Sequence, residues 1–307
     1  MLVIDHCRTA WIFAALFALA ASVSAADPAR VILLGTGTPI PNPSDSGPAV
    51  AIVVNNKAYL FDAGPGIVRR AQAAAQNFGI QALDAANLTR VFFTHLHSDH
   101  TLGYPDLMFT SWVVGRSEAL EAYGPIGTAA MTEHLKQAWA ADIKVRSEGF
   151  EGLNRRPLQV NVHEIKEVGQ VYKDANITIR ALAVPHGSWP QAFGYAIDAG
   201  GRKIVISGDT AASSTIAEAC NECDVLVHEV YSADRFDVVF GPVRGKYHAS
   251  FHTSTKELAV LASKSKPKLL VLYHQLYFGP QDQVDLEKEI RRTYTGPVVN
   301  GRDLTAY

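Results

Sequence analysis

The stretch His95-Leu96-His97-Ser98-Asp99-His100 places four potential metal ligands within six residues. It follows the apolar run 91–93, which predicts a strand that ends where the histidines begin. Because alternate residues of an extended chain point the same way, we expect His95 and His97 to face one side. Asp99 and His100 come after the strand end, where a second ion could sit beside the first. Imidazole and carboxylate ligands suit a borderline divalent ion such as zinc.

Further potential ligands follow other apolar runs of the sequence. His186 comes after residues 179–184, Asp209 after residues 203–206, and His274 after residues 269–273. Each run predicts a short strand that delivers one metal-competent side chain into a loop. Since active sites commonly form where strand ends converge, we expect these residues to share a site with His95–His100.

The composition is that of a folded protein without a strong overall charge. The chain has 307 residues, 48% of them hydrophobic, and 28 basic against 30 acidic residues give a net charge of −2. This is enough apolar material for a sizeable core and excludes a disordered or fibrous protein. A charge so close to zero disfavours a dedicated nucleic-acid binder.

The first 25 residues have the pattern of a secretory signal peptide. Arg8 precedes the apolar run 11–20, and Val23-Ser24-Ala25 is a small-x-small cleavage pattern. We therefore expect a signal peptide at 1–25, one mature domain at 26–307, and a periplasmic or secreted protein. Asp5 is unusual before such a run, so an uncleaved anchor remains the alternative. No later segment approaches the roughly 20 apolar residues of a membrane span.

The cysteines leave two interpretations open. Cys7 lies in the predicted signal, and Cys220 and Cys223 form a lone C-x-x-C pair. One pair cannot complete a four-thiolate zinc site. A local disulfide or two buried thiols is the simpler hypothesis, and a redox role is the alternative.

Apolar runs and turn residues predict one α/β domain without internal repeats. Strands are expected at 31–34, 49–54, 57–61, 91–93, 158–162, 177–184, 193–197, 203–207, 225–229 and 269–273. Helices are expected at 67–77, 104–112, 128–141, 212–222 and 255–263, with a polar loop at 147–157.

Taken in order, these motifs resemble the metallo-β-lactamase superfamily. The H-x-H-x-D-H stretch is followed by the three later ligands, and the similarity is greatest to the ribonuclease Z-like branch, including its arylsulfatase-like members. The supporting strings are Leu34-Gly35-Thr36-Gly37-Thr38-Pro39, Leu60-Phe61-Asp62-Ala63-Gly64, Ser207-Gly208-Asp209-Thr210, Val227-His228-Glu229 and His252-Thr253-Ser254-Thr255.

The resemblance implies an α/β fold, a four-layer αβ/βα sandwich with two mixed β-sheets, that carries two metal ions, zinc or other divalent metals. His95, His97 and His186 would hold the first ion, and Asp99, His100 and His274 the second. Asp209 would bridge the ions, with a water or hydroxide between them. The branch also implies a homodimer.

Three residues are expected to act in catalysis. Asp99 could hold the attacking water or pass on its proton. Glu229 and His252 match a pair in which the carboxylate orients the imidazole near the scissile group. His248 is a rival for the role of His252.

Departures from the ribonuclease Z pattern direct the expected substrate away from transfer RNA. Pro65, Ser46 and Gln275 stand where the family carries polar groups, and the long basic arm of ribonuclease Z is absent from the sequence, which offers only a modest basic loop at 146–156. We therefore expect an exported hydrolase of sulfate or phosphate esters, acting on small anionic substrates and not on nucleic acid. The candidates for an aryl pocket are Trp112, Trp139, Trp189 and Tyr277.

Two other functions stay open at this point. The first is the transfer-RNA 3′-processing endoribonuclease itself. The second is a β-lactamase or lactonase, against which the Glu229–His252 pair argues.

Overall fold

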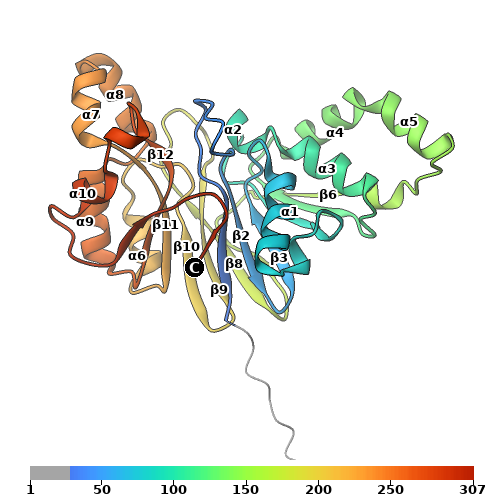
Figure 1. Ribbon diagram of the computed structural model, residues 1–307, viewed down its shortest axis with the longest axis horizontal. Coiled ribbons are helices and arrows are strands. Elements are labelled where there is room, and N and C mark those ends of the chain that lie inside the picture. The colour runs from blue at the N-terminus through green and yellow to red at the C-terminus, as the bar shows by residue number, and fades with distance from the viewer. Residues whose placement is uncertain (1–27) are drawn as a thin grey trace, which may run out of the picture.

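Two mixed seven-stranded β-sheets stand face to face at the centre of the protein (Figure 1). The computed structural model describes residues 28–307, so the predicted signal peptide lies outside the described residues. None of the helices within residues 28–307 combines the length and the hydrophobicity that a membrane span requires.

The first sheet is built from the N-terminal half of the chain, and the last strand of the chain forms one of its edges. Asn55 and Asn56 join two of its strands and both have positive φ angles, 47° and 53°. This is the backbone of a tight hairpin turn, which asparagine tolerates, so the predicted hairpin is confirmed. In spatial order the strands are β14 (Thr305–Ala306), β1 (Arg30–Gly35), β2 (Ala49–Val54), β3 (Lys57–Phe61), β4 (Arg90–Phe92), β5 (Leu120–Gly124) and β6 (Val160–Glu164).

The second sheet is built from the C-terminal half. In spatial order its strands are β13 (Val298–Asn300), β12 (Leu270–Leu276), β11 (Val225–Tyr231), β10 (Arg202–Ile206), β9 (Phe193–Ala199), β8 (Ile177–Ala183) and β7 (Gly169–Lys173). The parallel pairing of β11 with β12 matches Glu229 with Tyr273 and Val230 with Gln275, which leaves His274 as an extra residue. His274 has a φ of 45°. It is thus a bulge, a feature common beside active sites.

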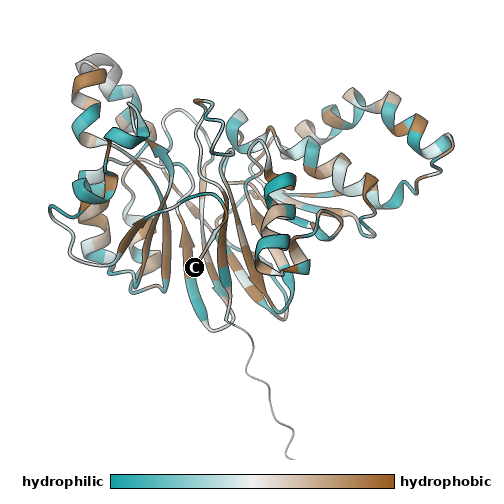
Figure 2. Ribbon diagram, in the orientation of Figure 1, coloured by the Kyte–Doolittle hydropathy of each residue, from teal (hydrophilic) through white to brown (hydrophobic). Residues whose placement is uncertain are grey.

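The alternation of side chains along the strands creates three apolar layers. In β1, Val31 and Leu33 point into the core between the sheets, whereas Ile32 and Leu34 point into the core beneath the helices. Figure 2 accordingly shows hydrophobic residues along the strands of both sheets. The predicted four-layer αβ/βα sandwich is confirmed.

Helices cover the outer face of each sheet. The first sheet is covered chiefly by α1 (Ile67–Phe78) and α3 (Tyr104–Val113), with the single turn α2 (Ser98–Thr101) at its end. The second sheet is covered by α6 (Ser214–Cys220), α9 (Thr255–Ser265) and α10 (Leu286–Ile290). Cys220 and Cys223 are joined in a disulfide at the end of α6, with their Cα atoms 4.7 Å apart.

Several elements differ from the sequence-based expectation. The helix predicted at 128–141 is two helices, α4 (Thr128–Ala138) and α5 (Ala140–Glu148), so the predicted polar loop begins inside a helix. No helix was expected over the segment that forms α7 (Ala233–Val239) and α8 (Pro242–Phe251). Gly241 and Pro242 interrupt its pattern, yet proline is well tolerated at the first position of a helix, where its missing N–H costs nothing.

Candidate metal centre

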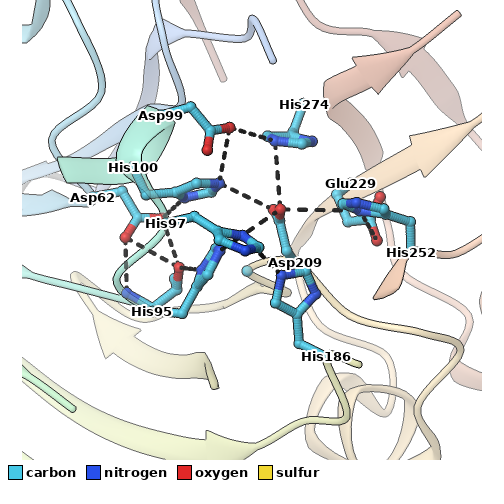
Figure 3. A network of polar contacts seen from close by, with 12 residues as sticks. Asp62, His95, His97, Asp99, His100, His186, Asp209, Glu229, His252 and His274 are labelled. Carbon is cyan, nitrogen blue, oxygen red and sulfur yellow. Dashed lines mark hydrogen bonds and ion pairs between the residues drawn. The ribbon is translucent and has the colours of Figure 1, made fainter. Parts of the chain in front are cut away.

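All seven predicted metal ligands lie together at one end of the sandwich (Figure 3). β4 leads to His95 and His97, and α2 carries Asp99 and His100. The second sheet supplies the other ligands: His186 after β8, Asp209 after β10, and His274 from the bulge in β12. Strands of both sheets therefore converge on one site, as the sequence predicted.

The first cluster consists of His95, His97, His186 and Asp209, whose ligand atoms all lie within 4.8 Å of one another. Nδ1 of His97 is 2.9 Å from Nε2 of His95 and 3.2 Å from Nε2 of His186. Nε2 of His95 is 3.9 Å from Oδ2 of Asp209. Three imidazoles and one carboxylate in this arrangement are a donor set typical of zinc.

The second cluster consists of Asp99, His100 and His274, and Asp209 borders it as well. Nε2 of His274 is 3.2 Å from Oδ2 of Asp99 and 3.4 Å from Oδ2 of Asp209. Nε2 of His100 is 3.6 Å from Oδ2 of Asp99 and 3.3 Å from Oδ1 of Asp209. Asp209 thus touches both clusters with its two oxygens, so this part of the protein is suited to a binuclear metal centre.

Hydrogen bonds behind the clusters fix which nitrogen faces the site. Nδ1 of His100 donates to Asp62 at 2.8 Å, and Nδ1 of His186 donates to the carbonyl of Phe251 at 2.7 Å. Because both acceptors are oxygens that cannot donate, Nδ1 carries a proton in each ring, and Nε2 is the nitrogen that faces the clusters. The sequence analysis quoted Asp62 within a family string but gave it no role. Its position directly after a strand was the available signal.

Three buried polar atoms of the cluster residues have no hydrogen-bond partner among the described residues. They are Nε2 of His100, Oδ1 of Asp209 and Nδ1 of His274. An unsatisfied buried polar atom costs about 1–3 kcal/mol. A divalent cation would satisfy the first two, and this supports the fit of the clusters to metal.

Burial and neighbouring charges shift the pKa values of the histidines and aspartates in the site. Burial lowers the pKa of His95 well below its usual range and that of His186 to about 4, so both are neutral ligands at pH 7. Burial opposes ionisation of Asp209, but the protonated rings of His274 and His100, whose own pKa values the neighbouring carboxylates raise against burial, together outweigh it and hold the pKa of this carboxyl well below its usual range. Burial opposes ionisation of Asp99 too, but its hydrogen bond with His274 and the charges of His100 and His274 together lower the pKa of this carboxyl.

Glu229 and His252 form the predicted pair beside the clusters. Nδ1 of His252 lies 3.4 Å from Oε1 of Glu229 and 3.9 Å from Oδ2 of Asp209. The backbone N–H groups of Thr253 and Thr210 donate to the same Glu229 oxygen, at 2.9 and 3.2 Å. Burial raises the pKa of Glu229 well above its usual range and lowers that of His252 to about 4. The ring of His248 is 6.4 Å from that of His252, so His248 does not share this pairing.

A pocket of about 420 Å³ opens onto the site. Its floor is formed by ligands and by His252, and its walls are largely apolar. None of the four aryl-pocket candidates lines it: Trp189 donates to His97, Trp112 to the carbonyl of Asn154, Trp139 stacks on Phe109, and Tyr277 contacts Asn300. The lining aromatic residues are instead Phe240, Tyr247, His248, Phe251 and Phe278, which come mainly from helices that the sequence did not predict.

Comparison with known proteins identifies the family. Residues 57–275 match the model described as "Beta-lactamase superfamily domain". The chain belongs to the metallo-β-lactamase superfamily. It belongs to the ribonuclease Z-like branch, since it is 31% identical to ribonuclease Z of Mycobacterium bovis over 279 residues, which cover 90% of this chain and 96% of the relative. Ribonuclease Z of Mycobacterium marinum is also 31% identical, over 281 residues. A protein of this superfamily with these clusters is a metal-dependent hydrolase.

Solved structures share the fold of this superfamily member. The short form of human tRNase Z superposes with a TM-score of 0.66 at 23% identity, covering 91% of this chain and 98% of that one. The metallo-beta-lactamase fold protein YhfI from Bacillus subtilis superposes with a TM-score of 0.68 at 19% identity, covering 92% of this chain and all of that one.

The ribonuclease Z relatives overturn two expectations drawn from the sequence, namely an arylsulfatase-like hydrolase of small anionic esters and the exclusion of nucleic acid. The structure explains why the departures misled. Gly47 N–H donates to the carbonyl of Pro65, Ser46 accepts a hydrogen bond from Arg70, and the Gln275 amide donates to two backbone carbonyls. These positions hold loops together and lie outside the lining of the pocket at the metal centre.

Proposed function

We propose that this protein is a zinc-dependent phosphodiesterase of the ribonuclease Z type, which cleaves a phosphodiester bond in RNA, with a transfer-RNA precursor as the first substrate to test. The observation that carries the proposal is Asp209, which touches both ligand clusters and lies 3.9 Å from His252. The relatedness to ribonuclease Z along 90% of the chain supports RNA as the polymer.

The proposed ligands divide as the clusters do. His95, His97 and His186 would hold the first zinc, and Asp99, His100 and His274 the second, with Asp209 between them. When bound, two divalent cations polarise the phosphate and lower the pKa of a water molecule, so that it can lose a proton and attack phosphorus near neutral pH. The histidine-rich donor set favours zinc over magnesium, which prefers oxygen ligands.

Asp99 is the proposed proton acceptor on the attacking side. It borders the pocket, and its lowered pKa keeps the carboxylate ionised at pH 7. An ionised carboxylate there can accept a hydrogen bond from the attacking water and take its proton.

His252 and Glu229 are the proposed proton donors on the leaving side. Nδ1 of His252 faces Glu229, so Nε2 points away from that carboxyl, and His252 borders the pocket. Because burial raises the pKa of Glu229, the carboxyl can keep a proton and pass it to Nδ1 while Nε2–H protonates the leaving oxygen. The two backbone N–H donors from Thr210 and Thr253 fix the carboxyl in place.

Export remains a separate proposal. It is supported by the pattern of residues 1–25 and by the Cys220–Cys223 disulfide, because disulfides persist mainly in oxidising compartments. The proposed reaction specifies which bond is cleaved and in which polymer. The compartment would determine which RNA molecules are available as substrates.

The test is cleavage of a precursor transfer RNA that carries a 3′ trailer. We expect metal-loaded protein to release the trailer, and an excess of chelator to abolish the reaction. Nitrocefin and p-nitrophenyl sulfate serve as parallel substrates. Chelator-sensitive turnover of either of these, with intact precursor RNA, would contradict the proposal.

A further inference from the structure

Five aromatic side chains form one wall of the pocket above the metal centre. We name this set, Phe240, Tyr247, His248, Phe251 and Phe278, the aromatic wall. Phe240 follows α7, the next three belong to α8, and Phe278 follows β12. Figure 1 shows α7 and α8 at the same end of the sandwich as α2, which carries two of the ligands.

The rings of the aromatic wall are in mutual contact. The centroid of Phe240 is 4.3 Å from that of His248 and 4.7 Å from that of Phe278. His248 and Phe278 are 5.5 Å apart, and Tyr247 and Phe251 are 4.6 Å apart. These separations are typical of packed aromatic pairs, so the wall is a continuous surface rather than a set of isolated rings.

The aromatic wall adjoins the reactive groups directly. The ring of Phe251 is 4.9 Å from that of His186 and 6.4 Å from that of His97. The ring of His248 is 6.4 Å from that of His252, the proposed proton donor. A group bound against the wall would therefore lie next to the scissile phosphate.

The described residues that line the pocket offer no cationic side chain to a nucleic-acid backbone. Neither lysine nor arginine is found among the described residues that line it. Pro39 and Ile40 stand in the lining with the wall, and they are also apolar. The apolar lining of the pocket can therefore bind a flat, weakly polar group, while the metal centre would bind the phosphate.

An unpaired nucleobase is the part of RNA that fits. A volume of about 420 Å³ is too small for a duplex, whereas a single base presents a flat π-face that stacks on aromatic rings. His248 lines the same pocket and adds a polar ring edge to it. Burial lowers the pKa of His248, so its ring is neutral at pH 7 and can stack without carrying a charge into the wall.

We propose that the aromatic wall binds the unpaired nucleobase next to the scissile phosphate, by stacking on its rings and by a hydrogen bond from the base edge to His248. This inference rests on the proposed function, which makes RNA the substrate. It adds that cleavage takes place beside a single-stranded nucleotide, with little preference among the bases, because every base has a π-face.

The test compares two short oligoribonucleotides on the metal-loaded protein by fluorescence anisotropy. Both carry a methylene group in place of the bridging oxygen at the central linkage, which prevents cleavage, and one of them lacks the base beside that linkage. Their phosphates are identical, so a difference in Kd reports the base alone. We expect removal of the base to weaken binding by about fivefold to a hundredfold.

Substitutions in the aromatic wall should remove this difference. Phe240→Leu and Phe278→Leu keep apolar volume but lose the ring, and Tyr247→Leu alters a side chain that is 59% exposed, so its folding should be unaffected. His248→Phe keeps a ring and loses the polar edge, so a partial loss is expected. Phe150→Leu is the matched control, because Phe150 is fully exposed and lies outside the pocket lining.

The outcomes separate this inference from the proposed function. If binding depends on the base and the variants of the aromatic wall abolish this dependence, the base-binding role of the wall is supported, whether or not precursor transfer RNA is cleaved. The inference is overturned if the two oligomers bind equally, if neither binds, or if Phe240→Leu, Phe278→Leu and Tyr247→Leu all leave the difference intact. Cleavage of precursor RNA without base-dependent binding would support the proposed function and refute the base-binding role of the aromatic wall.

Discussion

Nδ1 of His100 lies 2.8 Å from Oδ2 of Asp62, although the two residues are 38 positions apart. Asp62 follows β3 with a φ of 60°, and its carboxylate also accepts hydrogen bonds from the backbone and hydroxyl of Thr94. The carboxylate thus joins the end of β3 to the segment after β4 and holds one ligand of the second cluster in orientation.

Asp62→Asn should weaken metal binding without unfolding the protein. Asparagine tolerates the left-handed backbone of Asp62, but it lacks the charge that makes the His100 imidazole a stronger ligand. We expect a loss of about tenfold to a hundredfold in affinity for one ion, measured by competition with a chromophoric chelator. Asp198→Asn, at an exposed ion pair with Arg180, is the control, and equal affinity in the two variants would refute the role of Asp62.

His252→Ala should separate turnover from metal content. The imidazole lies beside Glu229 and borders the pocket, so its loss removes the proposed proton donor. Turnover should fall by about a hundredfold or more, while the metal content by elemental analysis stays that of the unmodified protein. His134→Ala, on the exposed part of α4, should change neither quantity. Retained turnover in His252→Ala would transfer the role to another group.

Metal analysis should find about two ions per chain in the unmodified protein, since the two ligand clusters share Asp209. His186→Ala removes a ligand of the first cluster only, and the count should then approach about one. A count near one before any substitution would contradict the binuclear centre.

The free energy of unfolding should decrease as the pH is lowered from 7 to 5, in part because of His228. This side chain is fully buried, and burial lowers its pKa from 6.5 to about 4. The unfolded chain therefore binds a proton more readily than the folded protein in this interval, so stability is present above pH 6.5 and is lost as the pH falls toward 4. The contribution is about 2 kcal/mol in the free energy of unfolding between pH 7 and pH 5.

The variant His228→Asn isolates that contribution. Its amide can replace the hydrogen bond from Nδ1 of His228 to the Glu229 carbonyl, and it does not titrate. Denaturant unfolding of the variant should vary less with pH than that of the unmodified protein. Identical pH dependence would show that His228 does not titrate as expected.

The mature N-terminus provides the test of export. The cleavage pattern at Val23-Ser24-Ala25 predicts that the exported protein begins at Ala26 or Asp27. Intact mass of protein recovered from the periplasm or medium should match that start. A chain that retains residue 1 and stays in the cytoplasm would contradict the signal peptide.

The proposed metal ligands could be found from the sequence because they follow strands. A short apolar run that ends in histidine or aspartate marks the site whether or not the exact pairing is known, and this located His186, Asp209 and His274. The same local signal was available for Asp62. Its hydrogen bond to His100, however, depends on β3 and β4 being parallel neighbours, which only the folded sheet establishes.

By itself, the sequence predicted the residues of both clusters, because they follow short apolar runs, and its resemblance to the superfamily predicted the four-layer fold and the Glu229–His252 pair. Only the tertiary structure decided what surrounds them. Phe240 and Phe278 reach the pocket from segments with no clear helical or strand period, and Pro65, Ser46 and Gln275 turned out to hold loops rather than to meet a substrate. Such roles depend on contacts between distant parts of the chain, which local periodicity does not record.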